Sequence, residues 1–147
     1  MHAQVEYESN EPESYNVIPI DYEDTEGGDV VRLRGYLSLP KKLEGPTPLI
    51  VVFPGWDGVS DYEKKRATLL SELGYIAFAA DIYGANLQDI TDQDVMSSQM
   101  GEYMSDPALC LKRMQRAIDV ASDTEYAVVD KENIGIIGYC FGGSGVV

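Results

Sequence analysis

The sequence has few of the residues on which disulfide frameworks, metal sites and membrane anchors depend. Its 147 residues include one histidine, His2, and two cysteines, Cys110 and Cys140, whose wide separation does not suggest a disulfide framework. No run of 18 apolar residues is present, so no transmembrane helix is expected. The first residues show neither the basic nor the apolar region of a secretory signal. We therefore expect a cytoplasmic protein without a metal or another cofactor.

Positive charge is also scarce. Eleven Lys and Arg residues stand against 25 Asp and Glu residues, which gives a formal net charge of −14 at pH 7. Such an acidic chain is not expected to bind nucleic acid or an anionic membrane. Residues 1–29 contain nine acidic residues and no Lys or Arg. Within them, residues 1–13 are expected to be a disordered, solvated terminus, with an acidic interaction tail as the alternative.

The remaining residues, 14–147, are enough for one domain, and their hydrophobic patterns predict two kinds of strand. The stretches 15–22 and 30–39 flank a turn signal, and the second alternates between apolar and polar residues. We therefore expect an antiparallel hairpin whose second strand is half exposed. Continuous apolar runs at 48–54 and 75–81 are typical of parallel strands buried on both faces.

A helix is predicted directly after the strand at 48–54. Ser60 and Glu63 have the spacing of a capping box, and Gly74 has the character of a helix end. Helical spacing predicts that this helix buries Tyr62, Leu69, Leu70 and Leu73.

Two further helices are predicted before the last strand. The first begins at Thr91, and the second begins at Asp106-Pro107, because proline is favoured at the first helical position. The first has one face formed by Met96, Met100, Tyr103 and Met104, which we interpret as a core face rather than as an adaptable ligand pocket. The second has a buried stripe, in which we interpret Cys110 as structural, formed by Cys110, Met114, Ala117, Ile118 and Ala121.

The stretch from Asn133 to Gly143 combines a short apolar strand with a nucleophile on a tight turn. In the spacing Gly138-x-Cys140-x-Gly142, the cysteine stands at the apex and the flanking glycines remove Cβ atoms that would clash. A helix start after the turn favours an anion, which lowers the pKa of the Cys140 thiol. A nucleophile on a strand-to-helix turn is a site for acyl transfer.

Other interpretations of this stretch are less well supported by its residues. Cys140 could be a buried small hydrophobe or a redox-sensing thiol. A P-loop requires Lys-Ser/Thr after its last glycine, whereas Ser144-Gly145 follows Gly143 here. No register supplies the Gly-x-Gly-x-x-Gly of a dinucleotide site.

Three stretches together resemble the dienelactone hydrolase family. They are 56–62 (WDGVSDY), 73–84 (LGYIAFAADIYG) and 138–143 (GYCFGG), and they occur in the family's order. The resemblance covers about residues 30–147. It implies an α/β fold that is a truncated α/β-hydrolase, with a mostly parallel sheet and an N-terminal antiparallel hairpin. It also implies hydrolysis of small esters or lactones by a Cys-His-Asp triad.

The resemblance also assigns roles to individual residues. It implies that Cys140 is the nucleophile and that the backbone N–H groups of Trp56 and Phe141 form the oxyanion hole. Tyr83 is a candidate substrate contact, although a structural tyrosine is an equal alternative. Where family members carry a glutamate beside the resting thiol, this sequence has Gly55, and the nearby Asp57 is not at the equivalent position.

The triad is incomplete in these 147 residues. In the family the Asp and the His follow the nucleophile, and the one histidine here, His2, lies in the polar terminus and is not expected to act as the base. We therefore expect the N-terminal part of a larger hydrolase, inactive alone and with an apolar edge strand at 133–138. The alternative is an inactive fragment or a non-enzymatic module whose edge is completed by a partner chain.

Overall fold

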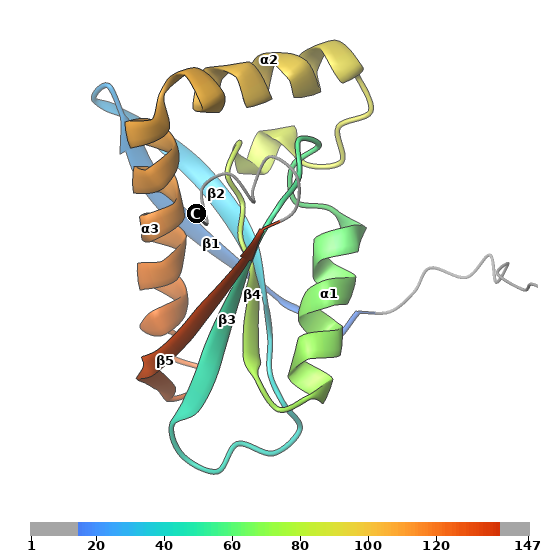
Figure 1. Ribbon diagram of the computed structural model, residues 1–147, viewed down its shortest axis with the longest axis vertical. Coiled ribbons are helices and arrows are strands. Elements are labelled where there is room, and N and C mark those ends of the chain that lie inside the picture. Colours follow the sequence, from blue (N-terminus) through green and yellow to red (C-terminus); the bar gives the residue numbers. More distant parts are fainter. Residues whose placement is uncertain (1–14, 139–147) are drawn as a thin grey trace, which may run out of the picture.

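The computed structural model describes residues 15–138, and this part of the chain forms a mixed sheet with helices on both faces (Figure 1). The strands lie in the order β1-β2-β4-β3-β5. Neighbouring pairs among β3, β4 and β5 are parallel, whereas β1 with β2 and β2 with β4 are antiparallel. The predicted α/β class with an N-terminal hairpin is therefore confirmed. The terminus predicted to be disordered, residues 1–13, lies outside the described residues.

The hairpin is formed by β1 (Ile18–Glu26) and β2 (Asp29–Ser38). Gly27 and Gly28 join them, both at positive φ (59° and 90°), a combination that suits a two-residue hairpin turn. The prediction of a half-exposed second strand holds only for the first half of β2. Tyr36 and Ser38, which fall on the polar side of the alternation predicted to be exposed, are buried. The reason is that this end of β2 pairs with β4 and is covered by α1.

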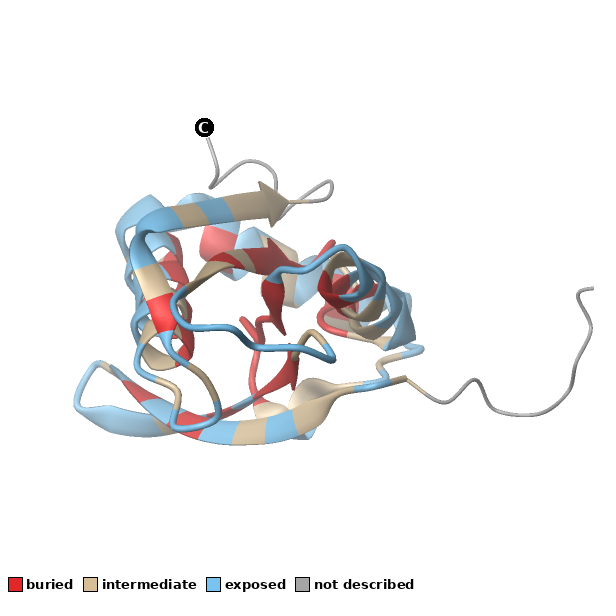
Figure 2. Ribbon diagram, turned by 90° about the horizontal axis from the view of Figure 1, so that it is seen from below, coloured by how far each residue is buried: buried red, intermediate tan, exposed pale blue. Residues whose placement is uncertain are grey.

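The centre of the sheet consists of β3 (Thr47–Phe53) and β4 (Ile76–Ala79). Every residue of β4 and the last three residues of β3 are buried, which confirms the prediction of parallel strands covered on both faces. The last strand, β5 (Val129–Gly138), pairs only with β3 in the described sheet and forms its edge. Its residues after Val129 are half-buried or exposed, as Figure 2 shows.

Helix α1 (Asp61–Glu72) covers one face of the sheet and begins with the predicted capping box. Ser60 accepts from the backbone N–H of Tyr62, and Glu63 accepts from the backbone N–H of Ser60 at 2.8 Å. The predicted apolar face is wrong for three residues, because Tyr62, Leu69 and Leu73 are 44%, 41% and 75% exposed. The buried side chains are Glu63, Ala67 and Ser71. The contact surface on the sheet includes Ala77 and Ala79, so small side chains allow a close approach.

Helices α2 (Gln93–Ser105) and α3 (Pro107–Ser122) follow a short 3₁₀ turn, Ala85–Leu87. Asp92 caps α2 just after the predicted start, and Asp106 caps α3 with Pro107 in its first turn, as predicted. Met96 and Tyr103 of α2 are buried, as predicted, but Met104 is 55% exposed, so the predicted core face is wrong for this residue. No helix within residues 15–138 is long and apolar enough to cross a membrane.

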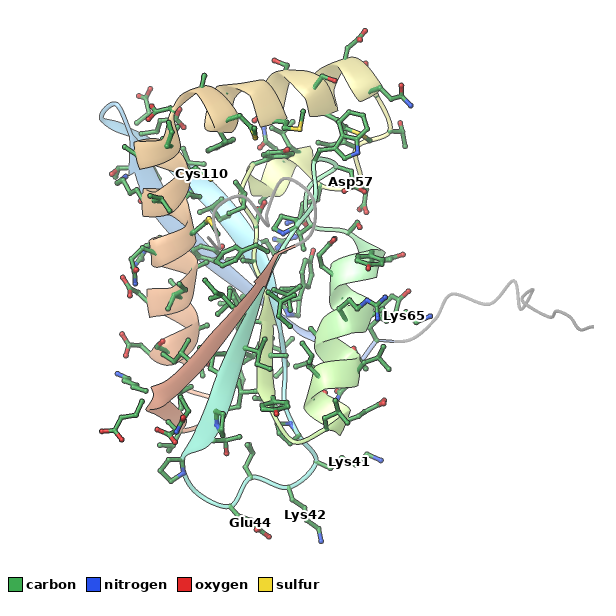
Figure 3. The ribbon with its side chains drawn as sticks, viewed as in Figure 1. Lys41, Lys42, Glu44, Asp57, Lys65 and Cys110 are labelled. Atoms are coloured by element: carbon green, nitrogen blue, oxygen red, sulfur yellow. The ribbon has the colours of Figure 1, made fainter. Side chains whose placement is uncertain are left out.

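The larger hydrophobic core lies on the α3 side of the sheet and the smaller on the α1 side. In Figure 1, α2 lies beyond the ends at which β3 and β4 finish. Lys41, Lys42 and Glu44 lie at the opposite end of the sheet (Figure 3). Ligands of open α/β sheets bind at the carboxyl ends of the strands. A ligand site is therefore expected in the loops between these strand ends and α2.

Candidate active site

The candidate site lies where β3, β4 and β5 end. Phe53, the last residue of β3, pairs with Gly138, the last residue of β5. The loop 80–84 follows β4, and its first residue is joined to β3 by a hydrogen bond of 2.9 Å from Ala80 N to Val52 O. Three strands therefore end at neighbouring points, and β5 ends two residues before Cys140 in the sequence.

The loop after β3 is a tight turn. The backbone N–H of Gly58 donates to the carbonyl of Gly55 at 3.1 Å, and Gly58 has a φ of 77°, which favours glycine. Pro54 and Gly55 are buried, while Trp56 and Asp57 are half-buried. Figure 3 shows Asp57 at the end of the sheet that faces α2. The turn thus holds Trp56 and Asp57 at the surface of the candidate site.

Tyr83 connects the loop after β4 to the loop after β3. Its hydroxyl donates to the carbonyl of Trp56 at 2.7 Å. The residue is 4% exposed, and its ring stacks on Tyr103 of α2 at a centroid distance of 5.7 Å and an interplanar angle of 24°. Burial, together with the nearby charge of Asp57, raises the pKa of Tyr83. Two of the residues singled out in the sequence, Trp56 and Tyr83, are therefore in direct contact.

Asp81 anchors the loop that carries Tyr83. Its carboxylate accepts hydrogen bonds from the backbone N–H groups of Arg34 at 3.0 Å and Gly84 at 3.1 Å. The hydroxyl of Tyr22 donates to the Asp81 carbonyl at 3.0 Å. Burial raises the pKa of Asp81 and outweighs the opposing effect of these backbone bonds. Asp81 therefore ties the end of β4 to the hairpin.

Arg113 of α3 supports the same loop from the other side. It is fully buried, and its Nη1 donates to the carbonyl of Ile82 at 2.7 Å and to the hydroxyl of Tyr103 at 2.9 Å. Its Nε donates to Asp24 at 2.9 Å and its Nη2 to Glu26 at 3.4 Å, both on β1. One guanidinium thus joins β1, α2, α3 and the loop after β4.

Sequence reasoning did not identify Asp81 or Arg113 as supports of the site. A signal was present for each. Asp81 directly follows a continuous apolar strand, at the edge where site loops begin. Arg113 lies at helical spacing within the buried stripe of α3, three residues after Cys110 and one before Met114, so a buried cation needing partners could have been inferred.

Cys140 and Phe141 lie outside the described residues, so their roles remain predictions. The other cysteine, Cys110, is buried on the inner side of α3, and its Sγ lies 3.9 Å from Met114 Sδ (Figure 3). Burial raises the pKa of the Cys110 thiol despite the opposing charge of Arg113. A protonated, packed thiol is inert, which agrees with the structural role predicted for Cys110.

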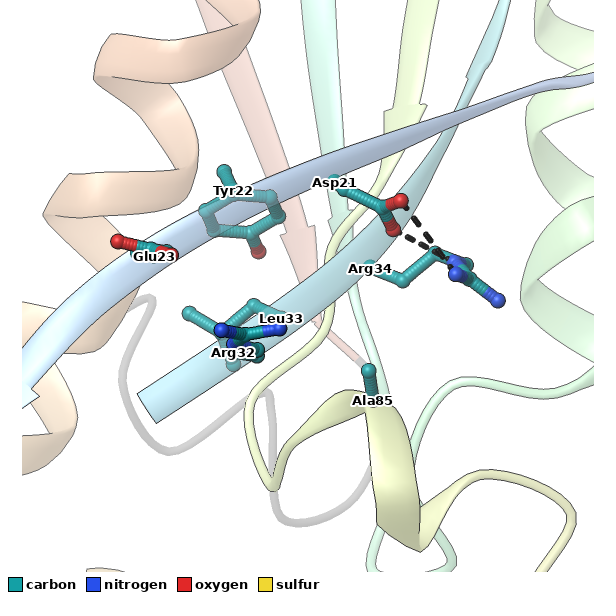
Figure 4. Close-up of a pocket in the computed structure, with 7 residues that line it drawn as sticks. All are labelled: Asp21, Tyr22, Glu23, Arg32, Leu33, Arg34 and Ala85. Carbon is teal, nitrogen blue, oxygen red and sulfur yellow. Dashed lines mark hydrogen bonds and ion pairs between the residues drawn. The ribbon is translucent and has the colours of Figure 1, made fainter. Parts of the chain in front are cut away.

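A hollow of about 360 Å³ opens elsewhere, between the hairpin and the 3₁₀ turn at Ala85 (Figure 4). Its acidic residues on β1 face its basic residues on β2, with Asp21 opposite Arg34 and Glu23 opposite Arg32, and Arg34 Nε donates to Asp21 at 2.6 Å. Among the described residues, no cysteine, serine, threonine or histidine lines it. Within residues 15–138, no cluster of three or more His, Cys, Asp or Glu side chains is arranged to hold a metal ion. The loops at the ends of β3 and β4 therefore remain the candidate site.

Known proteins resemble this chain in sequence and in fold. The model of the dienelactone hydrolase family matches residues 33–147. A dienelactone hydrolase-like promiscuous phosphotriesterase from metagenomic libraries superposes with a TM-score of 0.75 at 33% identity, covering 89% of this chain and 52% of its own. A Methylorubrum extorquens protein assigned as a carboxymethylenebutenolidase is 30% identical over 74% of this chain and 36% of its own length. A Bradyrhizobium protein assigned as a 2-oxo-3-(5-oxofuran-2-ylidene)propanoate lactonase is 27% identical over 74% of this chain and 42% of its own.

The chain matches these proteins over only part of their length. The chain spans about half of the solved phosphotriesterase and less than half of both assigned relatives. The matched region begins within β2 and contains every parallel strand of the described sheet, together with the segment around Cys140. This chain belongs to the dienelactone hydrolase family.

Proposed function

We propose that the protein is a hydrolase of small esters or lactones that uses Cys140 as its nucleophile. The observation that carries the proposal is the pairing of Gly138 with Phe53. It brings the chain, two residues before Cys140, beside the loop that carries Trp56. The resemblance of the stretch 138–143 to the family's nucleophile turn supplies the chemistry.

The reaction would proceed in two stages. The Cys140 thiolate attacks the carbonyl carbon, and the resulting oxyanion accepts hydrogen bonds from the N–H groups of Trp56 and Phe141. Collapse of this tetrahedral species breaks the C–O bond and leaves a thioester on Cys140, while the departing alkoxide takes up a proton as an alcohol. Water then attacks the thioester, the acid is released and the thiol is regenerated.

Both stages require a group that removes and returns protons. The family's triad supplies a histidine for this role, and the one histidine in these 147 residues is His2. We propose that the base comes from outside these residues and that the 147-residue chain alone does not turn over. The substrate class follows the names of the relatives, two of which are assigned to lactone opening.

The test is ester hydrolysis by the protein purified in the form in which its source organism produces it. We expect turnover of p-nitrophenyl acetate that is lost in Cys140→Ala and retained in Cys110→Ala, because Cys110 is buried in α3 away from solvent. The 147-residue chain should release at most one p-nitrophenol per molecule. Unchanged turnover in Cys140→Ala would rule out the proposed nucleophile.

A second candidate is a non-enzymatic module completed by a partner. The half-exposed β5 favours it, because an edge strand offers unpaired backbone groups to another chain. Sedimentation of the purified 147-residue chain separates the candidates. A stable assembly without esterase activity in any form of the protein would support the module. A monomer, together with ester turnover by the protein as its source expresses it, would exclude it.

We also propose a cytoplasmic location, which suits a reduced thiol. The net charge of −14 supports the prediction that neither nucleic acid nor an anionic membrane is a partner.

A further inference from the structure

We infer that Tyr83 is a positioning residue whose hydroxyl fixes the loop carrying the Trp56 N–H, and that a buried chain of contacts starting at Asp24 holds Tyr83 in place. The catalytic meaning of this inference rests on the proposed function, because it takes the Trp56 N–H as an oxyanion donor. The geometry of the loop itself does not depend on that assignment.

Two successive peptide units of the loop are held by different partners. The carbonyl of Gly55 accepts from Gly58 N at 3.1 Å, across the turn. Because a trans peptide points its N–H opposite to its C=O, the N–H of Trp56 is turned away from the interior of this turn. The next carbonyl, that of Trp56, accepts from the Tyr83 hydroxyl at 2.7 Å. The backbone on both sides of the Trp56 Cα is therefore fixed.

The ring of Tyr83 fits closely beneath this turn. A Cβ placed on Gly58 would lie 3.2 Å from Tyr83 Cδ2, so the loop and the ring are already in close contact. Another neighbour is Tyr103, whose ring stacks on that of Tyr83 at a centroid distance of 5.7 Å. With 4% of its surface exposed, Tyr83 has little freedom to move its hydroxyl away from Trp56.

Tyr103 is fixed in turn by a buried charge. Arg113 donates from Nη1 to the Tyr103 hydroxyl at 2.9 Å and to the Ile82 carbonyl, next to Tyr83, at 2.7 Å. Its Nε donates to Asp24 at 2.9 Å, and the side chain of Arg113 is completely buried. The contacts therefore run from Asp24 on β1 through Arg113 and Tyr103 to Tyr83 and the Trp56 carbonyl.

The experiment uses the fact that Trp56 is the single tryptophan of the 147 residues. In the 147-residue chain, fluorescence excited at 295 nm therefore reports on this loop without interference from another indole. Tyr83→Phe keeps the stacked ring and removes the hydroxyl. We expect the acrylamide quenching constant of Trp56 to rise about twofold in Tyr83→Phe, because the loop loses its tie. Tyr126→Phe, at a 46% exposed position, is the matched control and should leave the constant unchanged.

Kinetics of the protein as its source expresses it distinguish positioning from substrate contact. Loss of an oxyanion donor lowers kcat by about 10²–10³-fold in other hydrolases, so a donor that is only loosened should lower it by about tenfold. We expect Tyr83→Phe to lower kcat by about that factor with KM unchanged, and Tyr103→Phe to shift quenching and kcat in the same directions by smaller factors.

Each alternative result overturns a stated part of the inference. An unchanged quenching constant in Tyr83→Phe would show that the hydroxyl does not fix the loop. Increased quenching with unchanged kcat would remove Trp56 from the catalytic machinery, and a raised KM with unchanged kcat would make Tyr83 a substrate contact instead. Absence of ester turnover in the wild type would overturn the proposed function, and the quenching comparison would still decide whether Tyr83 fixes the loop.

Discussion

Arg113 Nε lies 2.9 Å from Asp24 Oδ2, and the two side chains are 0% and 7% exposed. Removing one partner of such a buried pair leaves an uncompensated charge in the interior and destabilises by about 3–5 kcal/mol. We therefore expect Asp24→Asn to lower the free energy of unfolding by roughly 3 kcal/mol, measured by urea denaturation. The control is Asp123→Asn. Its pair with Lys131, at 2.7 Å, joins side chains that are 70% and 63% exposed, so the loss should stay below about 1 kcal/mol. Equal losses in the two variants would contradict the buried role of Asp24.

Acidification should weaken the contribution of Asp24. Burial alone would raise its pKa, but hydrogen bonds from the Thr25 backbone, Lys112 and Arg113 outweigh it and lower the pKa. A carboxyl group whose pKa is lowered by folding stabilises the folded state at pH values above its unfolded pKa, about 3.9. This contribution is lost as the pH falls through the folded pKa. The difference in unfolding free energy between wild type and Asp24→Asn should therefore be constant from pH 7 to 5 and shrink below pH 4. A difference that grows on acidification would reverse the assigned sign.

Glu63 should show the opposite dependence on pH. Burial raises its pKa even though its carboxylate accepts hydrogen bonds from Ser60. A raised pKa favours folding below the unfolded value of about 4.3, and this contribution is lost as the pH rises through the folded value. Glu63→Gln keeps an oxygen that can accept from Ser60, so its stability relative to wild type should increase between pH 4 and pH 7. Urea titrations at these two pH values measure the change. A constant relative stability would mean that the folded and unfolded pKa values of Glu63 are equal.

Replacing either of two glycines by alanine should change the stability of the fold, in opposite directions for the two positions. A Cβ on Gly35 would lie 2.2 Å from Phe78 Cζ and 2.9 Å from the Ala79 carbonyl, in a fully buried part of the sheet. Gly35→Ala should therefore destabilise by about 1–3 kcal/mol or more, as overpacking does. A Cβ on Gly101, within α2, would meet nothing within 4 Å, so Gly101→Ala should stabilise by up to about 1 kcal/mol. Thermal denaturation of both variants measures the effects. A rise in Tm for Gly35→Ala would show that the Phe78 ring does not occupy this space.

The sequence predicted the elements that follow a strong local rule. The apolar runs that became β3 and β4 and the Ser60–Glu63 capping box all follow such rules. The buried face of α1 was predicted wrongly, because the close contact with the sheet beneath this helix requires small side chains. A pattern of large apolar residues does not reveal how closely two elements approach. The contact of Tyr83 with Trp56 joins residues 27 positions apart, which local periodicity cannot indicate.

The supports of the candidate site were missed for a related physical reason. Arg113 is buried only because Asp24, Tyr103 and the Ile82 carbonyl together satisfy its donors, and these partners come from three separate parts of the chain. The family resemblance pointed to the loops that follow β3 and β4, but it did not show what holds them. The supporting contacts depend on tertiary packing and needed coordinates to be identified.

The reactivity of the two thiols tests the central claim, that Cys140 is the nucleophile, most directly. Burial raises the pKa of Cys110, which should therefore react slowly in the folded protein. The two cysteines of the 147 residues can be separated by peptide mass after alkylation with iodoacetamide at pH 7. We predict that Cys140 is modified at least about tenfold faster than Cys110, and that denaturation removes most of this difference. Equal rates in the folded protein, or faster modification of Cys110, would contradict the claim.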